Sequence, residues 1–193
     1  MNAGFDWEHC FPLDFSLENG SSKGAQPTKR TLSDMKDMYF NQTAAAELLN
    51  REDLLVYEFY ELGAPNSPGD LAFGTSIVYP GKVGDEYFMT KGHFHSIMET
   101  AEVYYTLSGK GVLMLENPEG DVKVLPLEPG KVAYVSKRYA HRSINTGNAP
   151  LVTFFVFRAD AGHDYGSIET KGYRKLIVEK DGNPVCIDNP KWN

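Results

Sequence analysis

The run EYFMTKGHFHSIMETAEVYYTL, residues 86–107, places two histidines between segments that are rich in aromatic and β-branched residues. Such segments favour β-strands. Because side chains alternate between the two faces of a strand, His93 and His95 would share one face if the chain around them is extended. Glu102 begins the next expected strand, and Tyr104 has the same parity. We therefore expect these side chains to point into the interior of a β-protein.

Turn signals separate many short, strand-like runs beyond about residue 54, and they include Pro80-Gly81 and Pro129-Gly130. Strands at this spacing indicate a sandwich or a closed barrel. The run 151–157 is apolar on both faces, which predicts either a central strand covered on each side or a subunit interface. The expected strands are 56–60, 73–79, 86–89, 103–107, 111–115, 122–127, 132–135 and 151–157, followed by a late hairpin at 176–179 and 185–187.

The N-terminal part of the chain has a different pattern. Residues 1–32 are loosely patterned and are expected to form an arm, followed by one barrel domain over 33–193. Helical residues are expected near 33–50, with a helix start at Ser33 and with Thr43 as the cap of an alanine- and leucine-rich segment. The fold expected from the sequence is therefore all-β with a few short, mainly N-terminal helices.

Composition excludes several classes of protein. The 193 residues carry a formal charge of −7, so the basic footprint of a nucleic-acid-binding protein is absent. No apolar run approaches a membrane span, and the N-terminus lacks the basic and apolar residues of a signal peptide. Cys10 and Cys186 are far apart and form no C-x-x-C motif. We therefore expect a cytoplasmic protein without a disulfide framework, a nucleic-acid partner or a membrane partner.

Three of the five histidines in the chain belong to one candidate metal-binding set, His93, His95 and His141 together with Glu102. Imidazole and carboxylate groups are ligands for divalent transition metals. Such groups can converge from neighbouring strands of a small barrel. A six-coordinate ion with four protein ligands has two further positions, which suit two adjacent substrate oxygens or one oxygen and water.

The spacing of these residues resembles the cupin motifs. The first motif runs from Gly84 through the two histidines and Glu102 to Gly109, and the second from Gly130 through His141 to Asn145. The gap from histidine to glutamate is longer than in most cupins, as it is in the cupin-type glucose-6-phosphate isomerases. The strings that resemble this family are YPGKVG (79–84), TKGHFH (90–95), AEVY (101–104), AHR (140–142) and ADAGHDYG (159–166). The resemblance covers roughly residues 31–192.

This resemblance implies a cupin-type jelly-roll barrel, a homodimer and the interconversion of D-glucose 6-phosphate and D-fructose 6-phosphate. It implies one divalent metal ion per chain, preferably Fe(II), although the ligand set also suits Mn, Zn, Ni or Co. The implied site residues fall into three groups: catalytic Glu102, Tyr104 and His163; substrate-binding Tyr57, Ser76, Thr90, Gly92 and Tyr165; and metal-binding His93, His95, Glu102 and His141.

The role implied for Thr90 departs from strict strand alternation, and Phe157 departs from the residue that the family commonly has. Strict alternation would place Thr90 on the face opposite His93, unless a bulge at Gly92 changes the phase. Phe157 stands where the family commonly has tyrosine, so one phenolic donor is missing. Two other functions use the same residues: a cupin oxygenase that binds O₂ at the open metal positions, and a non-catalytic sugar-phosphate-binding cupin.

Overall fold

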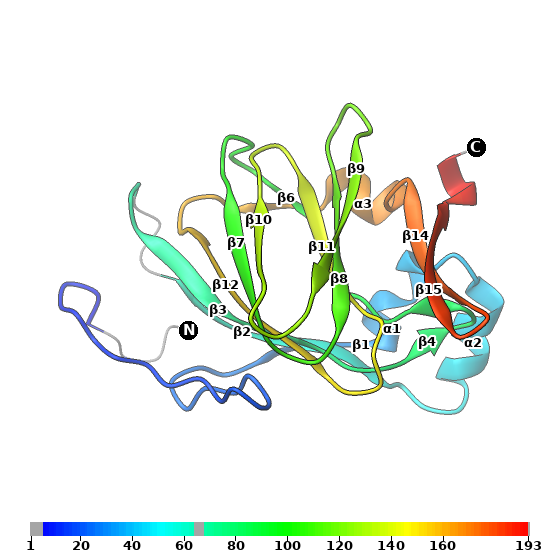
Figure 1. Ribbon diagram of the computed structural model, residues 1–193, viewed down its shortest axis with the longest axis horizontal. Coiled ribbons are helices and arrows are strands. Elements are labelled where there is room, and N and C mark those ends of the chain that lie inside the picture. The colour runs from blue at the N-terminus through cyan, green and yellow to red at the C-terminus, as the bar shows by residue number, and fades with distance from the viewer. Residues whose placement is uncertain (1–5, 64–67, 193) are drawn as a thin grey trace.

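The computed structural model describes residues 6–63 and 68–192, and strands dominate it (Figure 1). The strands are β1 (Thr28–Thr31), β2 (Leu55–Gly63), β3 (Leu71–Val78), β4 (Lys82–Val83), β5 (Glu86–Tyr87), β6 (Phe94–His95), β7 (Glu102–Ser108), β8 (Gly111–Glu116), β9 (Val122–Leu127), β10 (Val132–Val135), β11 (Ala140–Asn145), β12 (Leu151–Arg158), β13 (His163–Asp164), β14 (Lys175–Lys180) and β15 (Asn183–Asp188). The helices are α1 (Leu32–Met35), η1 (Lys36–Met38), α2 (Gln42–Leu49), α3 (Gly166–Lys171) and η2 (Pro190–Trp192).

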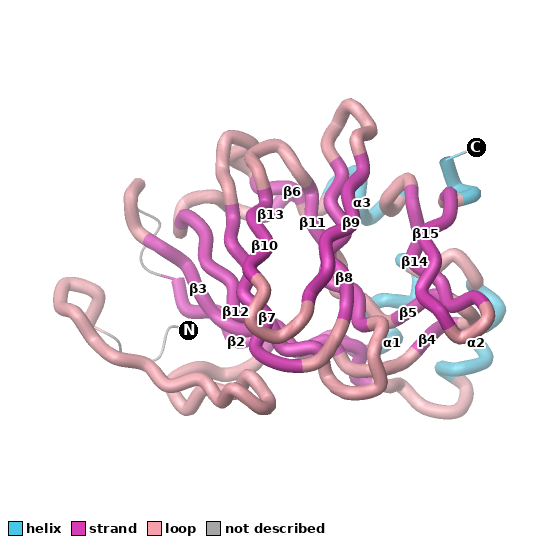
Figure 2. The backbone as a smooth tube through the Cα atoms, in the orientation of Figure 1, coloured by secondary structure: helices cyan, strands magenta, loops and turns pink. Residues whose placement is uncertain are grey.

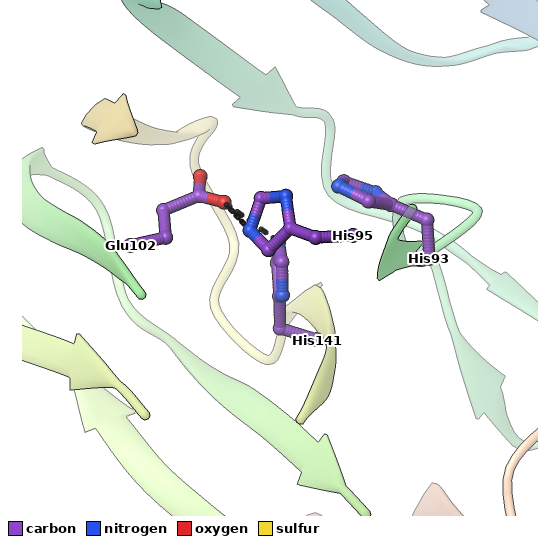
Figure 3. Close-up of side chains that lie close together, drawn as sticks. All are labelled: His93, His95, Glu102 and His141. Atoms are coloured by element: carbon purple, nitrogen blue, oxygen red, sulfur yellow. Dashed lines mark ion pairs between the residues drawn. The ribbon is translucent and has the colours of Figure 1, made fainter. Parts of the chain in front are cut away.

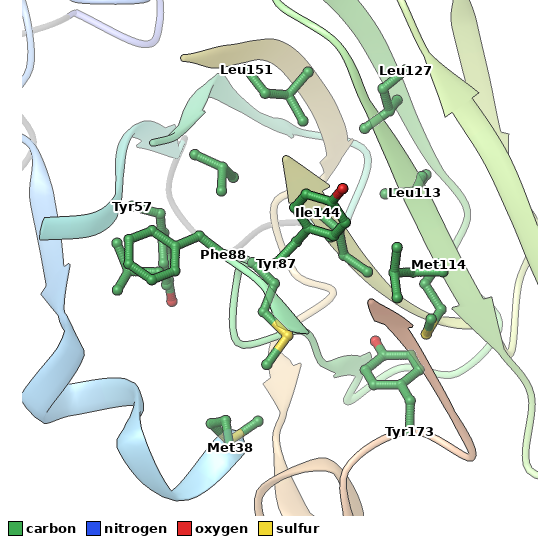
Figure 4. Close-up of a cluster of buried hydrophobic side chains, with 14 of the residues drawn as sticks. Met38, Tyr57, Tyr87, Phe88, Leu113, Met114, Leu127, Ile144, Leu151 and Tyr173 are labelled. Carbon is green, nitrogen blue, oxygen red and sulfur yellow. The ribbon is translucent and has the colours of Figure 1, made fainter. Parts of the chain in front are cut away.

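Two sheets form the body of the barrel (Figure 2). The larger has the strand order β1-β2-β3-β12-β7-β10 and the smaller β11-β8-β9. Both contribute to one apolar core, for example Phe155 from the larger sheet and Leu113 from the smaller (Figure 4 shows Leu113 with its neighbours). The expected all-β, cupin-type barrel is confirmed, and it places the inward faces of the two sheets opposite each other.

Strand β7 shows the alternation that the sequence predicts. Glu102, Tyr104 and Thr106 are buried, whereas the side chain of Tyr105 between them is 41% exposed. The register pairs Glu102 with Phe157 of β12 and Tyr104 with Phe155. One face of β7 therefore faces the barrel interior, and Glu102 lies at its first position.

Strand β12 lies at the centre of the larger sheet, between β3 and β7. Its outer face is covered by the N-terminal segment: Gly20 approaches Val152 so closely that an added Cβ would lie 2.8 Å from it. The ring of Phe15 lies edge-on to Phe154, with centroids 5.9 Å apart. Within one chain, the apolar run 151–157 is thus a central strand with both faces packed.

The expected helices exist, but their starts differ from the prediction. Helix α1 begins at Leu32 rather than Ser33, because the backbone N–H of Thr31 donates to Asp34 Oδ2 at 3.0 Å and fixes the turn one residue earlier. Helix α2 is capped by Asn41 rather than Thr43: Asn41 Oδ1 accepts from the N–H of Ala44 at 3.0 Å. Asparagine is a strong N-cap residue, so the earlier cap prevails.

The segment before His95 is not one extended strand. Strand β5 ends at Tyr87, two residues before the predicted end at Met89, and β6 contains only Phe94 and His95. Between them Gly92 has a φ of +74°, a left-handed conformation that interrupts a strand. The late hairpin is confirmed as β14 and β15, joined by a turn at 181–182. Among the described residues, no helix has the length and apolarity required to cross a bilayer.

Candidate metal centre

Three elements bring the four predicted ligand residues together (Figure 3). His93 and His95 lie in and beside β6, Glu102 starts β7, and His141 is the second residue of β11. One potential ligand atom from each residue lies within 4.8 Å of every other. Backbone hydrogen bonds between His93 and His141, with N–O distances of 3.4 and 3.1 Å, fix these two residues relative to each other.

The four atoms that converge are buried and have no hydrogen-bond partner. They are the Nε2 atoms of the three histidines and Oε2 of Glu102. Glu102 Oε2 lies 2.9 Å from His141 Nε2 and 3.2 Å from His95 Nε2, yet neither contact has hydrogen-bond geometry. Buried polar atoms are normally paired, and unpaired nitrogen and oxygen atoms pointing at one location are the donor set of a divalent ion. The residues present therefore fit a bound metal ion.

The electrostatics of the set also suit a cation. Burial opposes ionisation of Glu102, but its electrostatic interaction with the nearby His141 lowers the pKa of Glu102 below its usual value, so it is a carboxylate at neutral pH. Burial lowers the pKa of His93, which favours the neutral imidazole that binds metals. Burial would lower the pKa of His141 too, but the Glu102 carboxylate raises it.

An outer contact orients His141. Its Nδ1 atom lies 3.4 Å from the carbonyl oxygen of Tyr139, so a proton on Nδ1 leaves Nε2 free to face Glu102. Metal-ligating histidines commonly donate their other ring nitrogen in this way. The arrangement selects the tautomer that a metal site requires.

A cavity of about 230 Å³ opens beside this set. All the predicted substrate-binding residues line it, as do Tyr104 and His163. Of the predicted site residues, His95 alone is not among those that line the cavity. The lining residues are Tyr57, Phe59, Glu61, Ser76, Thr90, Lys91, Gly92, His93, Glu102, Tyr104, His141, Ser143, Phe155, Phe157, His163 and Tyr165. A pocket with several convergent polar groups is the usual form of a small-molecule site.

The left-handed turn at Gly92 explains how Thr90 reaches the same cavity as His93. The turn changes the phase of the chain, as the bulge alternative requires. Thr90 is held by Ser143 of β11, whose N–H donates to Thr90 Oγ1 at 3.1 Å and whose carbonyl accepts from the N–H of Thr90 at 2.9 Å. Thr90 and His93 can thus act on one ligand.

Tyr104 and His163 occupy distinct positions beside the metal-binding set. Burial and the negative charge of the nearby Glu102 raise the pKa of Tyr104, so its phenol remains protonated. His163 pairs with His95 through β13 and β6, and its ring centroid lies 4.2 Å from that of His93. Burial lowers the pKa of His163, which leaves a neutral imidazole facing the cavity.

Phe157 occupies the place of the absent phenol. Its ring centroid lies 5.4 Å from that of His95 and 5.6 Å from that of His163. The side chain is buried and adds an apolar wall next to the two imidazoles. Contacts between a ligand and the Phe157 side chain itself are therefore non-polar.

The sequence prediction missed several lining residues. Ser143 has the parity of His141 on β11, and Glu61 has the parity of Tyr57 on β2, so extending the alternation would have found both. Lys91 carried no such signal. Among the described residues that line the cavity it is the single Lys or Arg, and it forms an ion pair with Glu169 of α3. Its Nζ lies 5.0 Å from the ring centroid of Tyr165.

Comparison with known proteins identifies the family of this chain. Residues 29–193 match the family described as glucose-6-phosphate isomerase (GPI). The glucose-6-phosphate isomerase of Thermococcus kodakarensis is 48% identical over 187 residues, which is 97% of this chain and 98% of the relative. That of Pyrococcus furiosus is 45% identical over 186 residues, 96% of this chain and 98% of the relative.

A likeness in structure is more distant. Oxalate decarboxylase of Bacillus subtilis aligns with 55% of this chain and 27% of its own, at 25% identity and a TM-score of 0.45, which is too partial to bear on function. The match over residues 29–193 and the full-length relatives show that this chain belongs to the cupin-type glucose-6-phosphate isomerase family.

Proposed function

We propose that this protein interconverts D-glucose 6-phosphate and D-fructose 6-phosphate with the help of a divalent metal ion held by His93, His95, Glu102 and His141. The observation that carries the proposal is the convergence of four unpaired, buried ligand atoms next to a polar cavity. Relatives of nearly the same length that are named glucose-6-phosphate isomerases support the choice of substrate.

The reaction moves one hydrogen between C2 and C1 of the sugar and one proton between O2 and O1. A bound divalent metal ion would supply positive charge for the two adjacent oxygens as negative charge develops on them. Fe(II) is the preferred ion in this proposal, and Mn, Zn, Ni and Co suit the same ligands. The protein must then hold the sugar and transfer the proton.

Glu102 is proposed to transfer the proton between the two oxygens. It is ionised, so it has a carboxylate oxygen that can take up the proton, and it faces the cavity. Tyr104, which stays protonated close to Glu102, would donate to the oxygen whose charge changes. His163 is neutral at pH 7 and would contribute a second group for proton exchange beside the substrate.

The phosphate group would lie against the part of the cavity that Thr90 and Gly92 line. Hydroxyl groups of Ser76 and Tyr57 and the side chain of Tyr165 extend this polar wall. Lys91 provides the positive charge, since phosphate carries about two negative charges at neutral pH. Fixing the phosphate positions the distant C1–C2 end, which is how remote binding accelerates a reaction.

The homodimer in this proposal uses the outer face of the larger sheet where the N-terminal segment does not cover it. Tyr105, Val132 and Tyr134 are 41%, 64% and 61% exposed there. They lie on the adjacent strands β7 and β10. Exposed aromatic and aliphatic side chains gathered on one sheet face are typical of an interface.

A cytoplasmic location agrees with Cys10 and Cys186, which are both free.

The direct test is to follow both directions of the reaction by NMR on metal-loaded protein, with oxygen uptake recorded in parallel. The proposal predicts that either sugar phosphate is converted to the same equilibrium mixture without oxygen uptake. Oxygen-dependent loss of substrate would indicate an oxygenase, and tight binding without conversion would indicate a binding protein. Either result would refute the proposed isomerase.

A further inference from the structure

Arg142 is a buried arginine, 2% exposed, that forms no ion pair within 4.0 Å among the described residues. The buried Glu86 acts on it electrostatically from further away. The guanidinium carbon of Arg142 lies 4.6 Å from the ring centroid of Tyr173, whose position in the core Figure 4 shows. Burying a charge without a counter-ion in direct contact is costly, so the guanidinium requires hydrogen-bond acceptors close to it.

That interaction is with the backbone of the loop that lines the cavity. Arg142 Nη2 donates to the carbonyl oxygen of Lys91 at 2.6 Å, and Nε donates to the same oxygen at 3.2 Å. Two donors from one rigid guanidinium fix the direction of this carbonyl. The carbonyl therefore points away from the cavity and toward the buried arginine.

The direction of the Lys91 carbonyl fixes the direction of the next N–H group. The C=O and N–H groups of a planar trans peptide point in opposite directions, so the N–H of Gly92 points away from Arg142. Gly92 lines the cavity, and among the described residues its N–H has no hydrogen-bond partner. The peptide thus presents an unpaired donor to whatever occupies the cavity.

Arg142 is what bonds the Lys91–Gly92 peptide to the neighbouring strand β11. Thr90 on one side and His93 on the other are bonded to Ser143 and His141 of β11. The peptide between them is bonded to that strand through the Arg142 side chain alone among the described residues. A Cβ at Gly92 would lie 2.7 Å from Tyr173 Oη and 3.0 Å from the carbonyl oxygen of His141, so the turn has little room to rearrange.

We propose that Arg142 is a positioning residue for phosphate recognition: it holds the Lys91–Gly92 peptide so that the Gly92 N–H faces the phosphate group of the sugar. This inference rests on the proposed function for the identity of the ligand. The buried positive charge also polarises the peptide that it bonds, which strengthens the N–H as a donor to an anion. Arg142 itself does not touch the substrate.

The test compares two ligands that differ only in the phosphate, 5-phospho-D-arabinonate and D-arabinonate, on metal-loaded protein. Their dissociation constants are measured for wild type, Arg142→Met, Arg142→Lys and the control Glu86→Gln. Glu86 is a buried carboxylate that acts electrostatically on Arg142 but accepts from the N–H of Phe40 and does not bond the loop, so its variant changes the charge near Arg142 without removing the bond to Lys91. Metal content is measured on every sample.

We expect Arg142→Met to raise the dissociation constant of 5-phospho-D-arabinonate by about 10-fold or more, the usual effect of losing a charge-assisted hydrogen bond. Binding of D-arabinonate and the metal content should stay within about twofold of wild type, and Glu86→Gln should resemble wild type. Arg142→Lys, which keeps the charge and one donor, should restore part of the difference. If Arg142→Met does not fold, the selective loss must appear in Arg142→Lys.

Equal weakening of both acids, loss of metal, or no change in either variant would overturn the inference. A wild-type protein that prefers the phosphorylated acid but converts neither sugar phosphate would refute the isomerase alone. A working isomerase whose Arg142 variants lose no phosphate preference would refute the role of Arg142 alone.

Discussion

Glu102 Oε2 lies 2.9 Å from His141 Nε2, and both side chains are at most 2% exposed. This contact joins the first residue of β7 to the second residue of β11, two strands that belong to different sheets. A carboxylate and an imidazole so close in the interior would share a proton or a cation. His93 and His95 add unpaired ring nitrogens to this contact, so the four side chains together could hold a divalent cation.

Removing one histidine of the set should remove the metal. We expect His141→Ala to lower the metal content well below one ion per chain and activity with it, because three ligands remain of four. His163→Asn is the matched control, since His163 lies beside His93 but outside the set. It should keep its metal while losing activity. Elemental analysis and turnover on the same samples distinguish the two variants, and metal-replete His141→Ala would be inconsistent with the site.

Metal affinity should fall as the pH is lowered. An imidazole binds metal only when it is neutral, and Glu102 raises the pKa of His141 above its usual value of about 6.5. Protonation of His141 therefore begins to compete with metal near neutral pH, whereas His93, whose pKa is lowered, is protonated only at lower pH. Competition with a chelator of known affinity between about pH 8 and pH 5.5 measures this effect. An affinity independent of pH would contradict it.

The two proposed roles of Glu102 can be separated. Glu102→Gln keeps an oxygen ligand of similar size but removes the charge and the base. Once refilled with excess metal, the variant should remain slow by about 10²-fold or more, the usual effect of losing a general base. Metal content and kcat are measured on one sample. A fully metallated variant with near-wild-type kcat would leave Glu102 with the ligand role only.

Phosphate recognition should depend on Lys91. We expect Lys91→Gln to raise KM for glucose 6-phosphate about 10-fold with a smaller effect on kcat, because a charge-assisted contact with the phosphate is lost. Lys137→Gln is the control, since Lys137 forms a similar ion pair with Glu99 outside the cavity. Unphosphorylated glucose should be a far poorer substrate for wild type. Similar turnover of glucose and glucose 6-phosphate would exclude this part of the cavity as the phosphate site.

Much of the fold and of the metal-binding set could be predicted because both depend on local periodicity. Alternation in β7 placed Glu102 and Tyr104 on the inner face, and the turn signals separated the strands. The H-x-H pair needed one more element, the histidine of β11, which sequence spacing could suggest but not place. The isolated bridge between His93 and His141 supplies that placement.

Other features depend on contacts between distant residues and on single dihedral angles. The face of Thr90 follows from the φ of +74° at Gly92, which no pattern of side chains specifies. The cap of α2 is Asn41, because its side chain reaches the Ala44 N–H before Thr43 could act. The hydrogen bond from Arg142 to the Lys91 carbonyl joins residues 51 positions apart, so the local periodicity of the sequence could not predict it.

Isomerisation by this protein is expected to require one metal ion held by His93, His95, Glu102 and His141. The most direct measurement is to remove metal from the protein, verify the removal, and add Fe(II) anaerobically in steps while following fructose 6-phosphate formation. The account predicts negligible activity at the start and a linear recovery that ends at about one ion per chain, since four ligands form one site. Full activity in the verified metal-free protein, before any metal is added, would contradict it.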